Sequence, residues 1–495
     1  MKFRIGISFL AYLECLSALA QGPYFATGFR IGEVSPDKAI LWGRLTAAAE
    51  RNWNGLEPSP LMSPTRVFVE FPDVPASTWE GAVPGQAGRL RAGVALQPDF
   101  REAKWTAWTD VGPDTDYSHK FDLTGLAPRT RYYVTLEGQL DANAPIQRSA
   151  LGTFQTAPAP DQWADIWFTV VNCQLYYQRD ARQGFRIYRS MANLSPLFLG
   201  YPQFVVSTGD NVYYDRDNPR GRTPDLCRLH WQRMYSLPML RDFFRQVPGY
   251  WEKDDHDTFF DDCDATLDAP WIKPLTWKQG LQVFNEQVPI GETPYRTFRW
   301  GNGLQIWLTE SREFRSSNKA PDGPAKTIWG AKQKAWLKQS VVASDATFKL
   351  LISPTALVGP DNPNQADNHA DAAFRTEGNE IRQWIRDEPK VGNFYVINGD
   401  RHWQYASTDP STGVREFNGG PASDAMVLNN PGLVPNYHSF HRSGGGFVSV
   451  SVSRSQKNAG KGENAPPPGV ATITFRIHNV DGEVLHVFRD VGKAR

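Results

Sequence analysis

Ile166-Trp-Phe-Thr-Val-Val-Asn-Cys173 is the stretch that decides the fold, because an apolar run ends there in polar residues. An uninterrupted run of this length is typical of a strand that is buried on both faces. Downstream of it, similar strands alternate with helical segments, so we expect an α/β sheet. The expected strands are 166–171, 203–207, 304–308, 348–352 and 393–397, and the expected helices are 183–194, 226–246, 331–342 and 377–386.

The segments on either side of this region have the pattern of β-structure. Strands are expected at 446–452, 471–477 and 483–489 near the C-terminus. Between residues 22 and 157 no long helical period occurs, and apolar and polar residues alternate at 38–44 and 65–71. Residues 121–158 resemble the end of a fibronectin type III module, with a Leu-x-x-Leu-x-Pro turn, a Tyr-centred strand and a final Thr-x-Pro. We therefore expect a β-sandwich, in a packing or spacer role rather than a binding role.

The first residues indicate export. Lys2 and Arg4 precede a mostly apolar segment, 5–20, that closes with Ala18-Leu-Ala20, which is the pattern of a signal peptide over residues 1–20. A buried N-terminal helix is the alternative. We expect a secreted, periplasmic or cell-surface protein without a transmembrane span, since no later window holds about 18 uninterrupted apolar residues. The Ala/Pro-rich residues 157–161 predict a linker, so the expected domains are 21–157 and 162–495.

The composition excludes some classes of protein. The chain has 495 residues with 53 Lys and Arg against 53 Asp and Glu, so it lacks the excess positive charge of a nucleic-acid-binding protein. Four Cys and nine His are too few for a disulfide scaffold or a zinc-ribbon array, so a metal site must rely on carboxylates or use only a few of the His and Cys. Because Cys15 falls in the signal peptide, three cysteines remain. One pair among Cys173, Cys227 and Cys263 could be bridged, which would leave one thiol over.

Four blocks of polar residues stand at predicted turns beside the expected strands and helices. They are Asn172-Cys173, Gly209-Asp-Asn-Val-Tyr213, Tyr250-Trp-Glu-Lys-Asp-Asp-His-Asp257 and Asn398-Gly-Asp-Arg-His402. Any one carboxylate among them could simply cap a helix. Together they supply a thiolate, a phenolate, an imidazole and several carboxylates at the strand ends where α/β sheets bind ligands. Such a set suits ferric iron or a mixed pair of metal ions.

Three of these blocks resemble the signature of calcineurin-like metallophosphoesterases: Gly209-Asp-x-x-Tyr213, Asp254-Asp-His-Asp257 and Gly399-Asp-x-His402. With the Cys173 block and the stretches 310–315 and 329–337, the chain is similar to the PhoD-type alkaline phosphatase/phosphodiesterase family. This resemblance implies an α+β/α/β protein in which a fibronectin- or Ig-like sandwich precedes an αββα metallophosphatase domain.

The resemblance also implies roles for single residues. Asp210 would bridge two metal ions, with a ferric ion completed by Cys173, Tyr213 and His402. With Cys173 as a ligand, Cys227 and Cys263 would be the two cysteines that could form a disulfide. Asp255 and Asp400 would serve a second ion, Ca²⁺ or another divalent metal. The implied metal ligands are therefore Cys173, Asp210, Tyr213, Asp255, Asp400 and His402. Five anionic ligands would balance the five positive charges of a trivalent and a divalent ion. His256 would be catalytic, protonating the leaving oxygen or orienting the phosphate.

The implied activity is hydrolysis of a phosphate ester by a metal-bound hydroxide. A phospholipase D-like phosphodiesterase is the near alternative, and a non-catalytic adhesion or carbohydrate-binding protein is a more distant one. The choice between monoester and diester substrates stays open, as does the oligomeric state. Arg179, Arg312 and Arg401 are each candidates for phosphate contact. Asp261, Asp262 and Asp264 are expected on the solvated surface.

Overall fold

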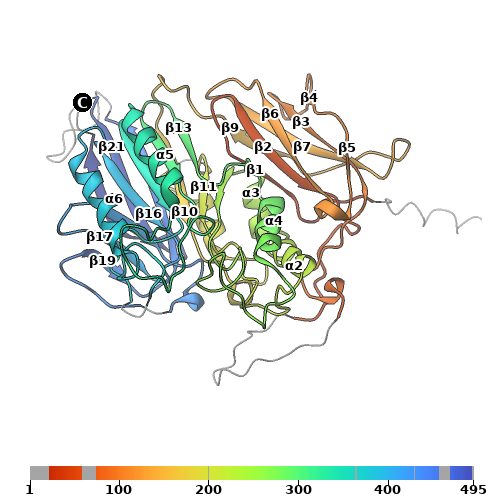
Figure 1. Cartoon of the computed structure of the whole chain (residues 1–495). Coiled ribbons are helices and arrows are strands. Elements are labelled where there is room, and N and C mark those ends of the chain that lie inside the picture. Colours follow the sequence, from red (N-terminus) through yellow and green to blue (C-terminus); the bar gives the residue numbers. More distant parts are fainter. Residues whose placement is uncertain are drawn as a thin grey trace, which may run out of the picture.

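The computed structural model describes residues 22–57, 74–198, 200–362, 365–428, 430–455 and 469–492. The expected signal peptide and the expected strand 65–71 lie outside these residues. Three β-sheets and six α-helices make up the described part (Figure 1). The helices are α1 Arg186–Ala192, α2 Pro224–Tyr235, α3 Pro238–Phe244, α4 Trp277–Gln287, α5 Gly330–Ala343 and α6 Arg375–Asp387.

The largest sheet has nine strands in the order β22-β21-β20-β10-β11-β12-β1-β2-β6. At its centre β10, β11 and β12 run parallel, while β20 pairs antiparallel with β10. The strands are β22 Val484–Val491, β21 Ala471–Asn479, β20 Gly446–Arg454, β10 Ile166–Val171, β11 Val205–Thr208, β12 Gly249–Glu252, β1 Phe29–Gly32, β2 Lys38–Arg44 and β6 Ser118–Thr124.

A seven-stranded sheet lies beside it in the order β13-β14-β15-β16-β18-β17-β19, with β14, β15 and β16 parallel. The strands are β13 Arg296–Trp300, β14 Leu304–Leu308, β15 Phe348–Ser353, β16 Phe394–Asn398, β18 Arg415–Gly419, β17 Gln404–Thr408 and β19 His438–Arg442. One buried apolar cluster joins the facing sides of the two sheets, with Phe168 from β10, Leu350 from β15 and Val450 from β20.

Helices cover the two outer faces, which gives a helix–sheet–sheet–helix arrangement (Figure 1). Trp167 and Val171 of β10 pack with α1 to α4, whereas Phe168 and Val170 point toward the other sheet. Successive residues of a strand face opposite sides, so β10 needs apolar residues on both faces. This explains why 166–171 is apolar except for Thr169, which is also buried.

The N-terminal strands divide between two sheets. The third sheet follows the order β4-β3-β7-β8, with β5 on β3 and β9 on β7. Its strands are β3 Gly88–Ala95, β4 Lys104–Trp105, β5 Thr109–Val111, β7 Arg131–Gln139, β8 Gln147–Arg148 and β9 Gly152–Gln155. Leu90 and Val134 of this sheet share an apolar core with Phe29 and Leu41 of β1 and β2. The fibronectin type III assignment and the domain boundaries stay predictions.

The nine-stranded sheet continues from the N-terminal strands into the α/β region. β1 pairs in parallel with β12 through Gly32 and Gly249. A Cβ atom on Gly32 would lie 2.2 Å from the Pro289 carbonyl oxygen, so this junction requires glycine. The side chain of Arg30, also in β1, is buried and its guanidinium lies over the rings of Trp42 in β2 and Tyr235 in α2. The N-terminal strands are therefore attached directly to the sheet that carries the site.

Two helix expectations need correction. The expected single helix 226–246 consists of α2 and α3, because Pro238 begins a new helix and cannot continue the preceding one. The expected helix 183–194 is shorter, 186–192.

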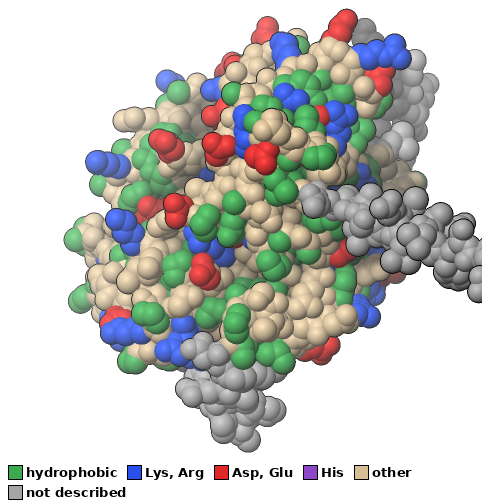
Figure 2. Space-filling model, turned by 90° about the vertical axis from the view of Figure 1, so that its right-hand side faces the viewer, with side chains coloured by type: hydrophobic (Ala, Val, Ile, Leu, Met, Phe, Trp, Pro, Cys, Tyr) green, Lys and Arg blue, Asp and Glu red, His purple; other side chains and the backbone are tan. Residues whose placement is uncertain are grey.

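Among the described residues, no helix combines the length and apolar character that crossing a bilayer requires. On the face formed by the N-terminal strands, acidic and basic side chains are interspersed, unlike the basic stripe of a nucleic-acid-binding surface (Figure 2).

Candidate metal centre

Three of the predicted ligands stand immediately beyond parallel strands and share an uncommon backbone conformation. Cys173 follows β10 with φ 50°, Asp210 follows β11 with φ 52°, and Asp400 follows β16 with φ 63°. Left-handed conformations are rare outside glycine and concentrate at functional sites. Gly399 lets the two sheets meet, because a Cβ there would lie 2.4 Å from the Thr208 carbonyl oxygen. The strand ends of both sheets therefore converge on one site.

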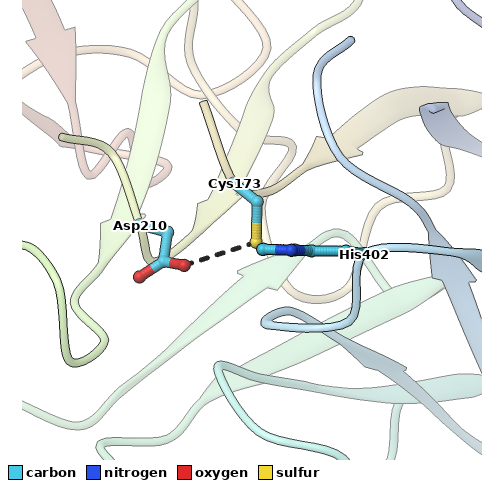
Figure 3. Close-up of side chains that lie close together, drawn as sticks. All are labelled: Cys173, Asp210 and His402. Carbon is cyan, nitrogen blue, oxygen red and sulfur yellow. Dashed lines mark hydrogen bonds between the residues drawn. The ribbon is translucent and has the colours of Figure 1, made fainter. Parts of the chain in front are cut away.

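The first group of ligands comes from three separate loops (Figure 3). One potential ligand atom from each of Cys173, Asp210 and His402 lies within 4.8 Å of the others. The Sγ atom of Cys173 is 3.4 Å from Oδ2 of Asp210. The hydroxyl of Tyr213 donates to the same Oδ2 over 2.8 Å and lies 3.5 Å from Nε2 of His402. All four residues assigned to the ferric ion thus lie together.

A second group shares Asp210 with the first. Ligand atoms of Asp210, Asp255 and His256 lie within 4.8 Å of one another. Asp400 lines a cavity that opens onto these ligands, but its carboxylate contacts the guanidinium of Arg401, and it joins neither group in the described part of the chain. The structure therefore brings together five of the six predicted ligands and leaves Asp400 beside them.

Hydrogen bonds between the blocks hold this arrangement. Asp257 accepts the backbone N–H of Asn211 over 3.0 Å with one carboxylate oxygen and that of Asp254 over 2.7 Å with the other. Asp254 in turn accepts a hydrogen bond from Arg312, which is fully buried. Arg312 is thus engaged inside the protein and does not line the cavity, so the structure does not support it as the arginine that contacts phosphate.

The chemistry of the site fits bound cations. Oδ1 of Asp210 and Oδ1 of Asp255 are buried without a hydrogen-bond partner. Burial, reinforced by the charge of Asp210, raises the pKa of both Cys173 and Tyr213 well above their usual values. Burial likewise raises the pKa of Asp210. Isolated thiolate, phenolate and carboxylate groups are unfavourable here, and a cation would reverse that preference.

The two histidines have opposite electrostatic environments. Burial, followed by the charge of His256, lowers the pKa of His402 to about 3, so its imidazole is neutral and can bind a metal. Burial also acts to lower the pKa of His256, but Asp215, Asp255 and Asp210 raise it well above its usual value. The protonated His256 is therefore suited to act as a general acid, and the neutral His402 is suited to act as a metal ligand.

Asp215 is a site residue that the sequence reasoning missed. Its Oδ1 lies 2.6 Å from Nδ1 of His256, and the carboxylate is buried. Nε2 of His256 is 3.3 Å from Asp261, and the imidazole centroid is 4.2 Å from that of the Tyr213 ring. The only available signal was the position of Asp215 two residues after Tyr213, in the same block.

A cavity of about 260 Å³ opens onto the site. Its polar wall includes Arg216 and Arg401 together with Asp261 and Asp262. Asp261 is exposed, as expected, and Asp262 is half-buried, whereas Asp264 is buried, contrary to the expectation. The apolar side of the cavity is formed by Leu175, Tyr177, Trp403, Met426 and Leu428. Of the three arginines proposed for phosphate contact, only Arg401 lines this cavity, and Arg216 was missed.

The cysteine pairing expected as one possibility is wrong. Cys173, Cys227 and Cys263 are all free and buried. The Sγ atom of Cys227 donates to the Gly221 carbonyl over 3.3 Å, and that of Cys263 donates to the Asp255 carbonyl over 3.5 Å. Each thiol therefore has its own backbone partner.

A sequence profile described as PhoD-like phosphatase matches residues 168–436, and one described as PhoD-like phosphatase, N-terminal domain, matches residues 13–158. Among solved structures, one described as the structure of PhoD aligns with a TM-score of 0.67 and 18% identity, covering 95% of this chain and 90% of that chain. Purple acid phosphatase PPD1 from yellow lupin (Lupinus luteus) seeds aligns with a TM-score of 0.59 and 10% identity, covering 93% and 73% respectively. The two structural alignments show a common fold, and at such low sequence identity they show the fold alone. No curated protein matches the chain.

Proposed function

The chain belongs to the PhoD-like phosphatase family and is a phosphoesterase, and we propose that it hydrolyses phosphate esters with Fe³⁺ and Ca²⁺, or another divalent ion, as cofactors. The observation that carries this proposal is the position of Asp210. Its carboxylate belongs to both groups of ligand atoms, one with a thiol and an imidazole and one with a carboxylate and an imidazole. Beside this shared carboxylate, the first group offers the soft thiol of Cys173 and the second the hard carboxylate of Asp255, and such a difference suits two different ions.

The residues can be assigned to the two ions from their chemistry. Cys173, Tyr213 and His402 would hold the ferric ion with Asp210, since thiolate and phenolate suit a strongly Lewis-acidic ion. Asp255 would hold the divalent ion, and Asp400 would join it by turning away from Arg401. When bound, these ions would supply the Lewis acidity that activates water and offsets the charge of the phosphoryl group.

His256 is proposed as the general acid. Its Nδ1 faces Asp215, so the proton on Nε2 is the one available for the leaving oxygen. For that transfer the leaving oxygen has to replace Asp261, which lies 3.3 Å from Nε2. A positioned acid of this kind contributes roughly 100- to 10,000-fold to the rate. Arg401 and Arg216 stand in the cavity wall where a phosphoryl oxygen would need donors.

A phosphodiesterase activity is the second candidate. The apolar wall formed by Leu175, Met426 and Leu428 offers contacts for the alcohol that a diester retains and a monoester lacks. Comparing the rates on 4-nitrophenyl phosphate and bis(4-nitrophenyl) phosphate decides between the two.

The proposal is tested on the purified protein by metal analysis and hydrolysis on the same sample. We expect iron and a divalent metal together with ester hydrolysis that a chelator abolishes. Full activity in a metal-free sample would contradict the proposal. Export is proposed from residues 1–20 alone and is tested by N-terminal sequencing of the mature protein, which should begin at Gln21.

A further inference from the structure

A second cavity adjoins the metal centre. It has a volume of about 390 Å³ and is lined by Glu57, Tyr177, Arg179, Asp180, Ala181 and Arg182. Tyr177 lines both cavities, and Gln178, the next residue, lines the first. One continuous segment, 177–182, therefore leads from the reaction site into the second cavity. The mechanism described above uses none of the arginines of this segment.

Arg179 carries positive charge that its neighbours do not offset. It belongs to a cluster of three arginines and two carboxylates. Arg51 lies 3.0 Å from Glu80, Arg233 lies 3.0 Å from Asp217, and Arg179 is 3.7 Å from Glu80. The closer arginines already balance the two carboxylates, so the cluster retains an excess positive charge at Arg179, beside the cavity.

Arg182 adds a second guanidinium. Its side chain is exposed and lies over the ring of Trp53, with 5.4 Å between the guanidinium carbon and the ring centroid. Among the described residues no carboxylate lies within ion-pair distance of it.

Two carboxylates line the cavity, Glu57 and Asp180. Asp180 accepts hydrogen bonds from the backbone and side chain of Arg186 over 2.8 and 3.2 Å, and Arg186 also pairs with Asp481 over 2.6 Å. Glu57 is the lining carboxylate without an arginine of its own among the described residues, and it opposes Arg179 and Arg182.

We infer that this second cavity binds an anionic group on the leaving alcohol of the substrate, so that the preferred esters carry a second phosphate or carboxylate. The inference rests on the proposed function, since it places the reacting phosphate at the metal centre. In the reaction, the bond from phosphorus to the alcohol oxygen breaks and a bond to the water oxygen forms. The alcohol oxygen takes a proton and leaves as the free alcohol, still held through its second anionic group by Arg179 and Arg182.

The test compares α,ω-alkanediol bisphosphates with the matching monophosphates, over chains of two to six carbons. The leaving alcohols have the same skeleton and differ in the second charge. We expect the metal-loaded wild type to hydrolyse one or more bisphosphates with a higher kcat/KM than the matching monophosphate. The value for a bisphosphate is first divided by two, because either of its two equivalent phosphate groups can react. Arg182→Ala should lower kcat/KM for the favoured bisphosphate about three- to five-fold and leave the monophosphate unchanged. Arg182→Glu should lower it further, and Glu57→Gln should raise it.

Arg189→Glu is the matched control, because Arg189 is also an exposed arginine of this region but lines neither cavity. It should leave the bisphosphate preference unchanged. Equal kcat/KM for both kinds of ester at every chain length, or equal losses in Arg182→Glu and Arg189→Glu, would overturn the inference. 4-Nitrophenyl phosphate monitors the proposed function separately, since it has no second anion. If no ester is hydrolysed, the affinities of the alkanediol bisphosphates and monophosphates, measured by calorimetry, decide whether the second site exists. Equal affinities of the wild type for the two would refute the second site.

Discussion

Replacing Asp215 by asparagine tests how His256 works. Oδ1 of Asp215 lies 2.6 Å from Nδ1 of His256, and both side chains are buried. Asparagine keeps the size of the side chain but removes the negative charge that stabilises the protonated imidazole. A hydrogen bond to a charged group contributes about 1.5–3 kcal/mol, which corresponds to roughly 10- to 150-fold in rate. Asp215→Asn should therefore lower kcat by about that factor where protonation of the leaving oxygen limits the rate.

The assay compares two esters that differ in their need for an acid. An alkyl phosphate such as glycerol 3-phosphate has a poor leaving group and requires the proton, whereas 4-nitrophenolate leaves with little help. We expect the loss in kcat to be large for the alkyl ester and small for the nitrophenyl ester, with an unchanged metal content. Asp225→Asn is the control for loss of one negative charge, because the Asp225 side chain is 80% exposed.

Equal losses on the two esters would refute this reasoning, since a merely structural role of Asp215 would not depend on the leaving group. An Asp215→Asn protein that keeps the full rate on the alkyl ester would refute it equally. Loss of metal in the variant would instead place Asp215 among the residues that hold the ions.

Three further predictions concern the metal centre and the stability of the fold. Asp210→Asn should lose both metals and activity together, while His256→Ala should keep the metals and lose turnover; metal analysis and kinetics on the same samples check both. If iron binds through Tyr213, the protein should show a visible absorption band from phenolate-to-iron charge transfer, and Tyr213→Phe should lose that band, whereas a colourless iron-containing wild type would contradict the assignment. Burial opposes the ionisation of Glu377, but a 3.0 Å hydrogen bond with His369 and bonds from neighbouring groups lower its pKa from 4.5 to about 2. A folded-state pKa below the unfolded one stabilises the protein above pH 4.5 and loses that effect as the pH falls toward 2. Glu377→Gln should therefore be less stable at pH 7 by about 1.5–3 kcal/mol, the contribution of a hydrogen bond to a charged group, with the difference shrinking in acid. Chemical denaturation of both proteins at pH 7 and pH 3 measures this, and a difference that does not change with pH would argue against it.

Much of the α/β region could be predicted from the sequence, because its strands are apolar on both faces. The run at 166–171 is continuous since Trp167 packs on helices and Phe168 on the other sheet. The division of 226–246 into two helices was missed, although Pro238 was visible as a residue that begins a helix. The direct pairing of β1 with β12 joins residues more than 200 positions apart, and no local pattern reports such a contact.

The site was predictable to a similar extent. Cys173, Asp210, Tyr213, Asp255 and His402 were recognisable because their blocks end strands and resemble a known family. The place of Arg312 was not, because a buried arginine paired with Asp254 and one facing a cavity look alike in sequence. The pairing of Cys227 with Cys263 failed for a related reason. An odd count of cysteines says nothing about which thiols approach one another.

The sequence by itself thus determined which chemical groups are present and at which strand ends they stand, because burial pattern and turn chemistry are local properties of the chain. Only the tertiary structure decided how those groups are combined. It placed Asp210 between two sets of ligands, set Asp215 against His256, and turned Asp400 toward Arg401. Asp210 and His402 come from loops of two different sheets, whereas Asp215 and His256 come from the loops after β11 and β12 of one sheet. Such distances exist only once the strands have paired and the sheets have packed.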